Sequence, residues 1–171
     1  MLRALAEAEA AAALGEVPVG AVLVDGAGTV LAAAGNRVEA TRDALAHAEM
    51  LVLQAATRRR GVKHLAGCDL WVTLEPCAMC AAAIAHARLR RLYFAAFDPK
   101  GGAVEHGPRL YRHPTTMQHR PEVYGGIAER RAADLLREFF RARREAGHRA
   151  AADPAAADRS CVGGGAAKDH P

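Results

Sequence analysis

The stretch that decides the fold is residues 73–80, Thr73-Leu74-Glu75-Pro76-Cys77-Ala78-Met79-Cys80. The apolar run that leads into it predicts a short buried strand, and Pro76 is tolerated in the first turn of a helix. Cys77 and Cys80 are three residues apart, so they share one face of that helix. Two thiolates at this spacing can form half of a tetrahedral zinc site, although structural zinc sites and redox pairs use the same spacing.

Upstream, His47-Ala48-Glu49 stands near the start of another predicted helix, 46–59. The neutral imidazole of His47 can supply a third metal ligand. One histidine and two cysteines leave a fourth coordination position open, which is typical of catalytic zinc. His47 and Glu49 do not share a helix face, so we expect the site at the end of this helix. From there the Glu49 carboxylate can accept and return a proton without binding the metal.

Strands and helices alternate around these two segments. The pattern predicts an opening helix, a hairpin and then helices and strands in turn. The predicted helices span 2–14, 46–59, 77–87 and 127–145, and the predicted strands span 19–24, 29–34, 69–74, 91–97 and 122–124. This order favours an α/β fold in which a mixed central sheet of about five strands carries helices on both faces.

Composition limits the class of protein. Of the 171 residues, 51% are hydrophobic and 25% are charged, as in a globular domain. We expect a domain over 1–145 and a disordered tail over 146–171, which is poor in large apolar residues. The net charge of +4 is compatible with a nucleic-acid partner but does not indicate one. The acidic residues near the N-terminus do not suit a signal peptide, and no stretch approaches the length of a membrane span, so we expect a cytoplasmic protein.

The combination of His-x-Glu with a downstream Pro-Cys-x-x-Cys is the signature of zinc deaminases that act on nucleobases. On this motif and its flanking segments, the chain resembles the bacterial tRNA-specific adenosine deaminases of the cytidine-deaminase-like superfamily. The resemblance covers about residues 2–145 and is carried by the segments 15–22, 35–37, 46–49, 72–80, 98–102 and 139–141.

The resemblance implies a three-layer α-β-α fold of the cytidine-deaminase-like type and one Zn²⁺ ion held by His47, Cys77 and Cys80. It implies that Glu49 is the proton shuttle while adenosine is hydrolysed to inosine. The implied substrate is the wobble adenosine in the anticodon stem-loop of an arginine tRNA, and the implied assembly is a homodimer. The substrate contacts that it implies involve five positions: Asn36, the backbone at Ala48, the segment around Glu75, Asp98 and Lys100.

Two positions depart from the pattern of that family. Leu45 stands where a small polar residue is usual, which leaves Asp43 as the candidate N-cap of the following helix. Phe97 stands where an arginine or a similar polar residue is often found. An aromatic ring there can stack on a base or pack inside the protein.

Other features leave alternatives open. The last predicted helix carries six arginines against three acids over 127–144, which suits either a solvated face or contacts with RNA phosphates. The loop histidines His106, His113 and His119 have no spacing that favours a further metal site. A deaminase of a free base or nucleoside, of the guanine or cytosine type, would use the same zinc chemistry. A non-catalytic RNA-binding protein could keep zinc for folding alone, but it would have no need of Glu49.

Overall fold

The computed structural model describes residues 1–113 and 117–152 of the chain. Its elements follow in the order α1 (Leu2–Ala13), β1 (Gly20–Val24), β2 (Val30–Gly35), α2 (Val38–Thr41), α3 (Ala48–Arg60), β3 (Asp69–Leu74), α4 (Ala78–His86), β4 (Arg91–Ala96), the 3-10 helix η1 (Leu110–Arg112), β5 (Glu122–Tyr124) and α5 (Glu129–Ala152). None of the described helices has the length and apolarity that crossing a membrane requires.

The predicted order of strands and helices is confirmed, with three differences. The one-turn elements α2 and η1 are absent from the prediction, because segments of three or four residues carry no periodic signal. Helix α5 continues to Ala152 instead of ending near Glu145. Gly147 does not stop it, since a single internal glycine costs only about 1 kcal/mol relative to alanine. The rest of the predicted tail lies outside the described residues.

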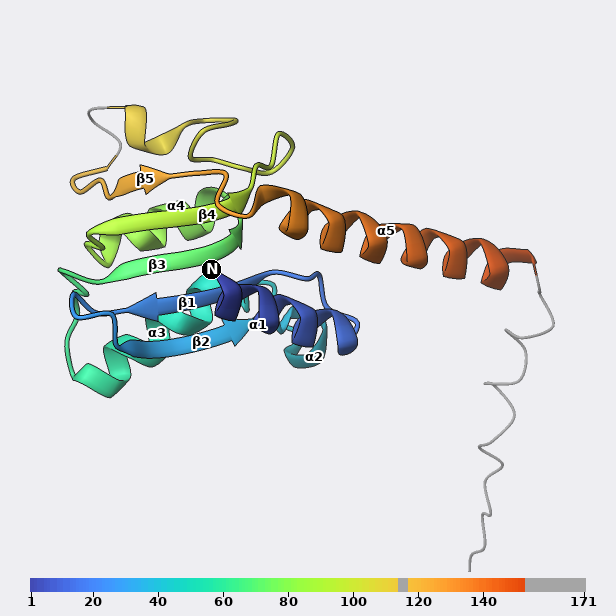
Figure 1. Ribbon diagram of the computed structural model, residues 1–171, viewed down its shortest axis with the longest axis horizontal. Coiled ribbons are helices and arrows are strands. Elements are labelled where there is room, and N and C mark those ends of the chain that lie inside the picture. Colours follow the sequence, from blue (N-terminus) through green and yellow to red (C-terminus); the bar gives the residue numbers. More distant parts are fainter. Residues whose placement is uncertain (114–116, 153–171) are drawn as a thin grey trace, which may run out of the picture.

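The five strands form one mixed sheet, as predicted, and their order in it is β2-β1-β3-β4-β5. Strand β1 is antiparallel to β2 and β3, whereas β3, β4 and β5 run parallel to one another. Helices α3 and α4 cover one face, and α1 and the beginning of α5 cover the other (Figure 1). The three-layer α-β-α arrangement is therefore confirmed.

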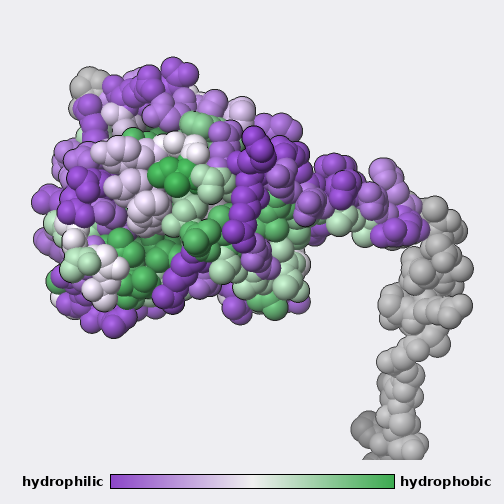
Figure 2. Space-filling model, viewed as in Figure 1, coloured by the Kyte–Doolittle hydropathy of each residue, from purple (hydrophilic) through white to green (hydrophobic). Residues whose placement is uncertain are grey.

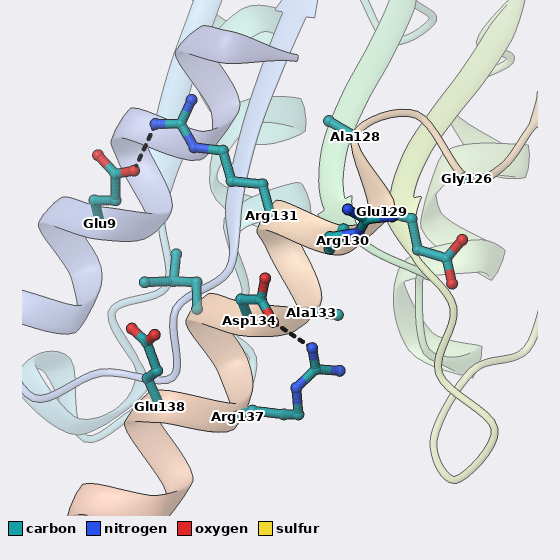
Figure 3. A pocket seen from close by; sticks show the side chains of 11 residues that line it. Glu9, Gly126, Ala128, Glu129, Arg130, Arg131, Ala133, Asp134, Arg137 and Glu138 are labelled. Atoms are coloured by element: carbon teal, nitrogen blue, oxygen red, sulfur yellow. Dashed lines mark hydrogen bonds and ion pairs between the residues drawn. The ribbon is translucent and has the colours of Figure 1, made fainter.

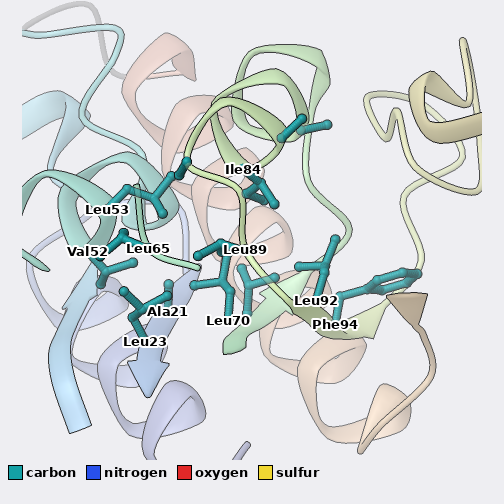
Figure 4. Close-up of a cluster of buried hydrophobic side chains, with 14 of the residues drawn as sticks. Ala21, Leu23, Val52, Leu53, Leu65, Leu70, Ile84, Leu89, Leu92 and Phe94 are labelled. Carbon is teal, nitrogen blue, oxygen red and sulfur yellow. The ribbon is translucent and has the colours of Figure 1, made fainter. Parts of the chain in front are cut away.

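The main hydrophobic core lies between the sheet and the α3–α4 layer. Alternation along the strands directs one set of apolar side chains to this face. This set meets apolar residues of α3, α4 and the connecting segments (Figure 4), and the buried members drawn there include Ala21, Leu23, Val52, Leu65, Leu70, Ile84, Leu89, Leu92 and Phe94.

Helix α1 lies very close to β1 and β2 because glycines face it. A Cβ atom at Gly20 would lie 2.1 Å from the carbonyl oxygen of Ala4, and one at Gly35 would lie 2.5 Å from that of Glu7. Real Cβ atoms do not approach other atoms so closely, so any larger residue would push the helix off the sheet.

The sheet brings together the segments that carry the predicted chemistry. Strands β3 and β4 are parallel neighbours, with Leu74 paired to Ala96 at their carboxyl ends. The segment that enters α4 and the loop that begins at Phe97 therefore leave the sheet side by side. Ligands of open α/β sheets bind beyond the carboxyl ends of the strands.

Candidate metal centre and substrate pocket

The three predicted metal ligands meet where two helices begin. His47 is the N-cap of α3 and Cys77 is the N-cap of α4, both with extended backbone conformations. Cys80 lies in the first turn of α4 and is buried. The sequence predicts that the site lies at the end of the helix that follows His47 and not along its side, and this geometry agrees with that prediction. Pro76 precedes the N-cap instead of occupying the first helical position.

The spacing of the three side chains suits a tetrahedral metal. Nδ1 of His47 lies 3.5 Å from Sγ of Cys80 and 3.7 Å from Sγ of Cys77. All three ligand atoms lie within 4.8 Å of one another. A tetrahedral zinc ion with ordinary Zn–N and Zn–S bonds separates its nitrogen and sulfur ligands by roughly 3.5 Å. Across residues 1–113 and 117–152, no other group of histidine, cysteine and acidic side chains converges in this way.

A hydrogen bond between the side chains of Cys77 and Cys80 shifts their two pKa values in opposite directions. The hydrogen bond from Cys80 lowers the pKa of Cys77 to about 4, against the effect of burial and with help from the His47 ring. The same hydrogen bond, together with burial, raises the pKa of Cys80 above its ordinary value. The shift favours the thiolate of Cys77, and binding of a metal would release the proton of Cys80.

The Glu49 carboxylate is buried without a full set of partners. Its side chain lies in the first turn of α3 and the residue is 3% exposed. Among the described residues, Oε2 of Glu49 is the buried side-chain oxygen that has no hydrogen-bond partner. Burial raises the pKa of Glu49 to about 6, against the attraction of His47. An orphaned carboxylate oxygen beside an N, S, S ligand set fits a metal centre that keeps a coordination position open for a polar molecule.

These groups line one small pocket of about 260 Å³, called the metal pocket below. Of the predicted site residues, six line it: Asn36, His47, Glu49, Glu75, Cys77 and Asp98. Cys80 and Ala48 are fully buried. Lys100 lies instead in a neighbouring groove.

Asn36 takes the capping role that the sequence analysis assigns to Asp43. Its Oδ1 accepts a hydrogen bond of 2.9 Å from the N–H of Ala48, the first residue of α3. Asp43 instead accepts from the N–H of Leu45 at 2.8 Å, so the prediction that Asp43 caps α3 is wrong. The N–H of Ala48 is thereby engaged within the protein, and the contact of Ala48 with a base stays a prediction.

A larger groove of about 1130 Å³, called the α5 groove below, lies beside the metal pocket and shares Val17, Leu74, Asp98 and Gly101 with it. One wall is the loop after β4 and the other is α5. Within the described part of the chain, three cations of this groove pair with no acid: Lys100, Arg141 and Arg144. The part of α5 that projects beyond the body carries mostly hydrophilic side chains (Figure 2).

Phe97 lines the α5 groove and also packs against its neighbours. It is 37% exposed. Its ring makes edge contacts with Phe94 at a centroid distance of 5.1 Å and with His106 at 5.8 Å. The ring is therefore held by the protein on its edge while part of its surface faces the groove, so stacking on a base stays a prediction.

Another groove, of about 970 Å³, lies between α1 and α5 but shares no residue with the metal pocket (Figure 3). Its acids and arginines largely neutralise one another, with Arg131 paired to Glu9 at 2.9 Å and Arg137 paired to Asp134. These pairs match the solvated-face interpretation for this part of α5.

Of the loop histidines, His106 contacts Glu75 and His119 contacts the carbonyl of Leu89.

Sequence reasoning misses Glu16, a pocket residue that is 1% exposed. A signal is present, because this glutamate stands in the apolar run 15–24 just before a buried strand. A buried carboxylate must find hydrogen-bond donors. Those donors lie far along the chain, so the residue type alone does not identify them.

Comparisons with known proteins agree with this geometry. The zinc-binding region of the cytidine and deoxycytidylate deaminases matches residues 1–96. The tRNA-specific adenosine deaminase of Agrobacterium fabrum is 54% identical over 141 residues, which are 82% of this chain and 91% of that protein. The identical residues are therefore spread over an alignment that covers most of both chains.

Solved structures with the same fold include two of interest. One comes from biochemical and structural studies of A-to-I editing by tRNA:A34 deaminases at the wobble position of transfer RNA. It is 53% identical, with a TM-score of 0.77, and the match covers 80% of this chain and 97% of that one. The guanine deaminase from Nitrosomonas europaea is 26% identical, with a TM-score of 0.68 and coverage of 80% of both chains. The chain belongs to the cytidine and deoxycytidylate deaminase family of zinc enzymes.

Proposed function

We propose that the chain is a zinc-dependent deaminase that converts adenosine to inosine at the wobble position of a tRNA anticodon, with an arginine tRNA as the expected substrate. The observation that carries this proposal is that the metal pocket and the α5 groove are neighbours with four lining residues in common. A site for one base thus adjoins a wall of unpaired cations.

The groove beside the metal pocket favours a base that belongs to a longer molecule. The metal pocket, at about 260 Å³, lies below the roughly 300–1,000 Å³ of pockets for drug-sized ligands and therefore suits a single base. Enzymes that act on a base in a nucleic acid extrude that base into a close-fitting pocket. The α5 groove offers space for the neighbouring nucleotides and cations for their phosphates.

The relatives support the same substrate. The Agrobacterium fabrum protein is named a tRNA-specific adenosine deaminase, and it is 54% identical to this chain. The structure at TM-score 0.77 belongs to studies of deaminases that act on the wobble position of tRNA. A shared RNA substrate is the simplest reason for this degree of identity across 80% of the chain.

In this proposal, His47, Cys77 and Cys80 hold the zinc ion. When bound, zinc lowers the pKa of water from about 15.7 towards about 7 and so makes hydroxide available at neutral pH. Glu49 accepts a proton from the attacking water on its carboxylate. It then delivers a proton to the departing nitrogen, so that adenosine and water give inosine and ammonia.

The substrate contacts remain part of the proposal. Asn36 is fixed by Ala48 through Oδ1, and its Nδ2 group donates to no residue within the described ranges, which leaves it for the base. Asp98 and Lys100 lie at the junction with the α5 groove, a suitable place for ribose and phosphate. The backbone at Ala48 and Glu75 would border the edge of the base.

An inosine assay tests the proposal directly. The zinc-loaded chain is incubated with an arginine tRNA anticodon stem-loop and, in parallel, with free guanine, cytosine, adenosine and cytidine. We expect inosine in the RNA and no product from the four small molecules. Turnover of a free base or nucleoside without turnover of the RNA would overturn the proposal, as would no turnover at all.

The unpaired arginines of α5 give a second test. Arg141→Ala combined with Arg144→Ala is expected to raise KM for the stem-loop and to reduce the slope of log KM against log salt by about one unit for each lost phosphate contact. The measurement is KM at several salt concentrations. Arg131→Ala is the matched control, because Arg131 is paired with Glu9 and lies outside the α5 groove. A salt slope equal to that of the wild type would mean that Arg141 and Arg144 lie on a solvated helix face and do not contact RNA phosphates.

A second candidate function is deamination of a free base. The solved guanine deaminase of Nitrosomonas europaea shares the fold at 26% identity, so the same scaffold also accommodates that activity. Free guanine in the assay above separates the two candidates. A free-base enzyme has no need of the cations along the α5 groove.

We further infer that the enzyme works as a homodimer, acts in the cytoplasm where its proposed substrate is found, and has its catalytic domain within residues 1–145. Leu45 is the position chosen to probe an interface near the site, because its side chain is 55% exposed two residues from His47. Sedimentation analysis of the wild type and of Leu45→Ser would test the assembly. A wild-type monomer at micromolar concentration would contradict it.

A further inference from the structure

Two buried carboxylates lie at the metal pocket, and each is bonded to a different segment of its wall. Glu16 is 1% exposed and Glu75 is 2% exposed, and both line the pocket without belonging to the metal cluster. The wall formed by residues 36–40 is called the first rim, and the wall formed by residues 98–106 is called the second rim. Each carboxylate is bonded to the backbone of one rim.

Glu16 holds the first rim. Its Oε1 accepts the N–H of Ala40 at 2.8 Å and its Oε2 accepts the N–H of Glu39 at 3.1 Å. These N–H groups lie in the first turn of α2, where they have no partner within the helix. The backbone of Glu16 is itself tied to α1, because its N–H donates to the carbonyl of Ala11 at 3.1 Å. The first rim, which includes Asn36, is thereby fixed to α1.

Glu75 holds the second rim with more bonds. Its Oε1 accepts the N–H groups of Val104, Glu105 and His106 at 3.2, 2.8 and 2.9 Å. Its Oε2 accepts the N–H of Asp98 at 3.1 Å and lies 2.7 Å from Nδ1 of the His106 ring. Five donors thus converge on one carboxylate, which leaves it no capacity for a base.

The packing around Glu75 is equally restrictive. A Cβ atom at Gly102 would lie 2.5 Å from the Glu75 carboxyl carbon and 2.5 Å from the carbonyl oxygen of Asp98. Ala103 donates to the carbonyl of Pro76 at 3.0 Å, and Gly102 forms a β-bridge with Cys77. The second rim therefore wraps around the carboxylate and is fastened to the segment that carries a metal ligand.

We infer that Glu16 and Glu75 are positioning residues that fix the backbone of the two rims, and that they set the affinity for RNA without acting on the chemistry at the metal. This inference rests on the proposed function and deepens it. It assigns Glu75 an action through Asp98 and the second rim, in place of a direct contact between its side chain and the base.

Kinetics of the zinc-loaded full chain on the anticodon stem-loop test the inference. Glu75→Gln and Glu16→Gln each keep the size of the side chain but replace one acceptor oxygen with a donor that faces N–H groups. We expect KM to rise about tenfold or more, with kcat within about threefold of wild type and zinc content unchanged. Glu122→Gln is the control, because Glu122 is exposed on β5 and pairs with Arg91 at 2.8 Å. Its KM should equal that of the wild type.

Amide hydrogen exchange gives a readout that needs no substrate. Glu75→Gln should speed exchange in peptides from residues 98–106, and Glu16→Gln in peptides from residues 38–41, while α4 keeps its protection. This result would stand even if the RNA were not the substrate, so the two proposals can fail separately. Unchanged exchange in both rims, an unchanged KM, or a fall in kcat with constant KM would overturn the inference.

A milder variant covers the case in which Glu75→Gln does not fold. His106→Ala removes one of the five donors, from a side chain that is 34% exposed. It should raise KM by a smaller factor than Glu75→Gln and speed exchange in residues 98–106. Wild-type values of both quantities in His106→Ala would contradict the proposed role of the second rim.

Discussion

Replacement of Glu49 by glutamine is expected to lower kcat for the stem-loop by about 10²- to 10⁴-fold, the usual contribution of a positioned general acid–base group. The amide cannot accept the proton from water, whereas its size and burial match those of the carboxylate. Zinc content should stay near one ion per chain, because Glu49 lies outside the group of three ligand side chains. The measurements are single-turnover rates and elemental analysis.

The pH dependence of the wild type should report the same group. Burial raises the pKa of Glu49 to about 6, so its ionised fraction falls as the pH drops through that value. Only the ionised form accepts a proton, and a bound cation stabilises that form. The rate of the wild type should therefore decline as the pH falls through or below about 6. The residual rate of Glu49→Gln should not show this decline.

Glu9→Gln is the matched control for Glu49→Gln, because Glu9 lies on α1 and forms an exposed pair with Arg131. It should leave rate and zinc content unchanged. Loss of zinc from Glu49→Gln would mean that Glu49 binds the metal. A rate near that of the wild type would remove it from proton transfer.

Replacement of Cys77 by serine is expected to abolish both zinc binding and activity. The thiolate of Cys77 forms readily, with a pKa lowered to about 4, whereas a serine hydroxyl does not ionise near neutral pH. Loss of a direct ligand should weaken metal affinity by more than the roughly 10- to 100-fold that loss of an outer partner costs. Zinc per chain and activity at saturating RNA are the two measurements.

The thermal stability of the Cys77→Ser variant should reveal the same loss. Zinc binds the folded state, so a chelator should lower the melting temperature of the wild type and leave that of the variant unchanged. Cys68→Ala is the control, since Cys68 is buried beside Arg60 and is not part of the metal cluster. It should retain one zinc ion. Full zinc occupancy in Cys77→Ser would refute the ligand set.

Much of the fold follows from local features of the sequence. The nearly continuous apolar run 70–74 predicts β3, because a strand in the middle of a sheet that is covered on both faces is apolar on both sides. The ligand positions His47, Cys77 and Cys80 are predictable because metal geometry restricts both the residue types and their spacing. Their convergence in three dimensions agrees with that expectation.

The supporting hydrogen bonds are not predictable in this way. Glu75 binds N–H groups that lie 23 to 31 residues further along the chain. Asn36 caps a helix that begins 12 residues later, so the local search for a cap finds Asp43 instead. Backbone donors are present at almost every position, and only the folded path of the chain selects among them.

The positions of His47 and Cys77 as N-caps have an electrostatic consequence. The ends of α3 and α4 that meet at the metal cluster are the ends at which each helix carries a positive partial charge, equivalent to roughly half an elementary charge. Positive partial charge at a helix N-terminus favours a thiolate over a thiol. The two helix ends therefore favour the deprotonated forms in which Cys77 and Cys80 would bind a metal.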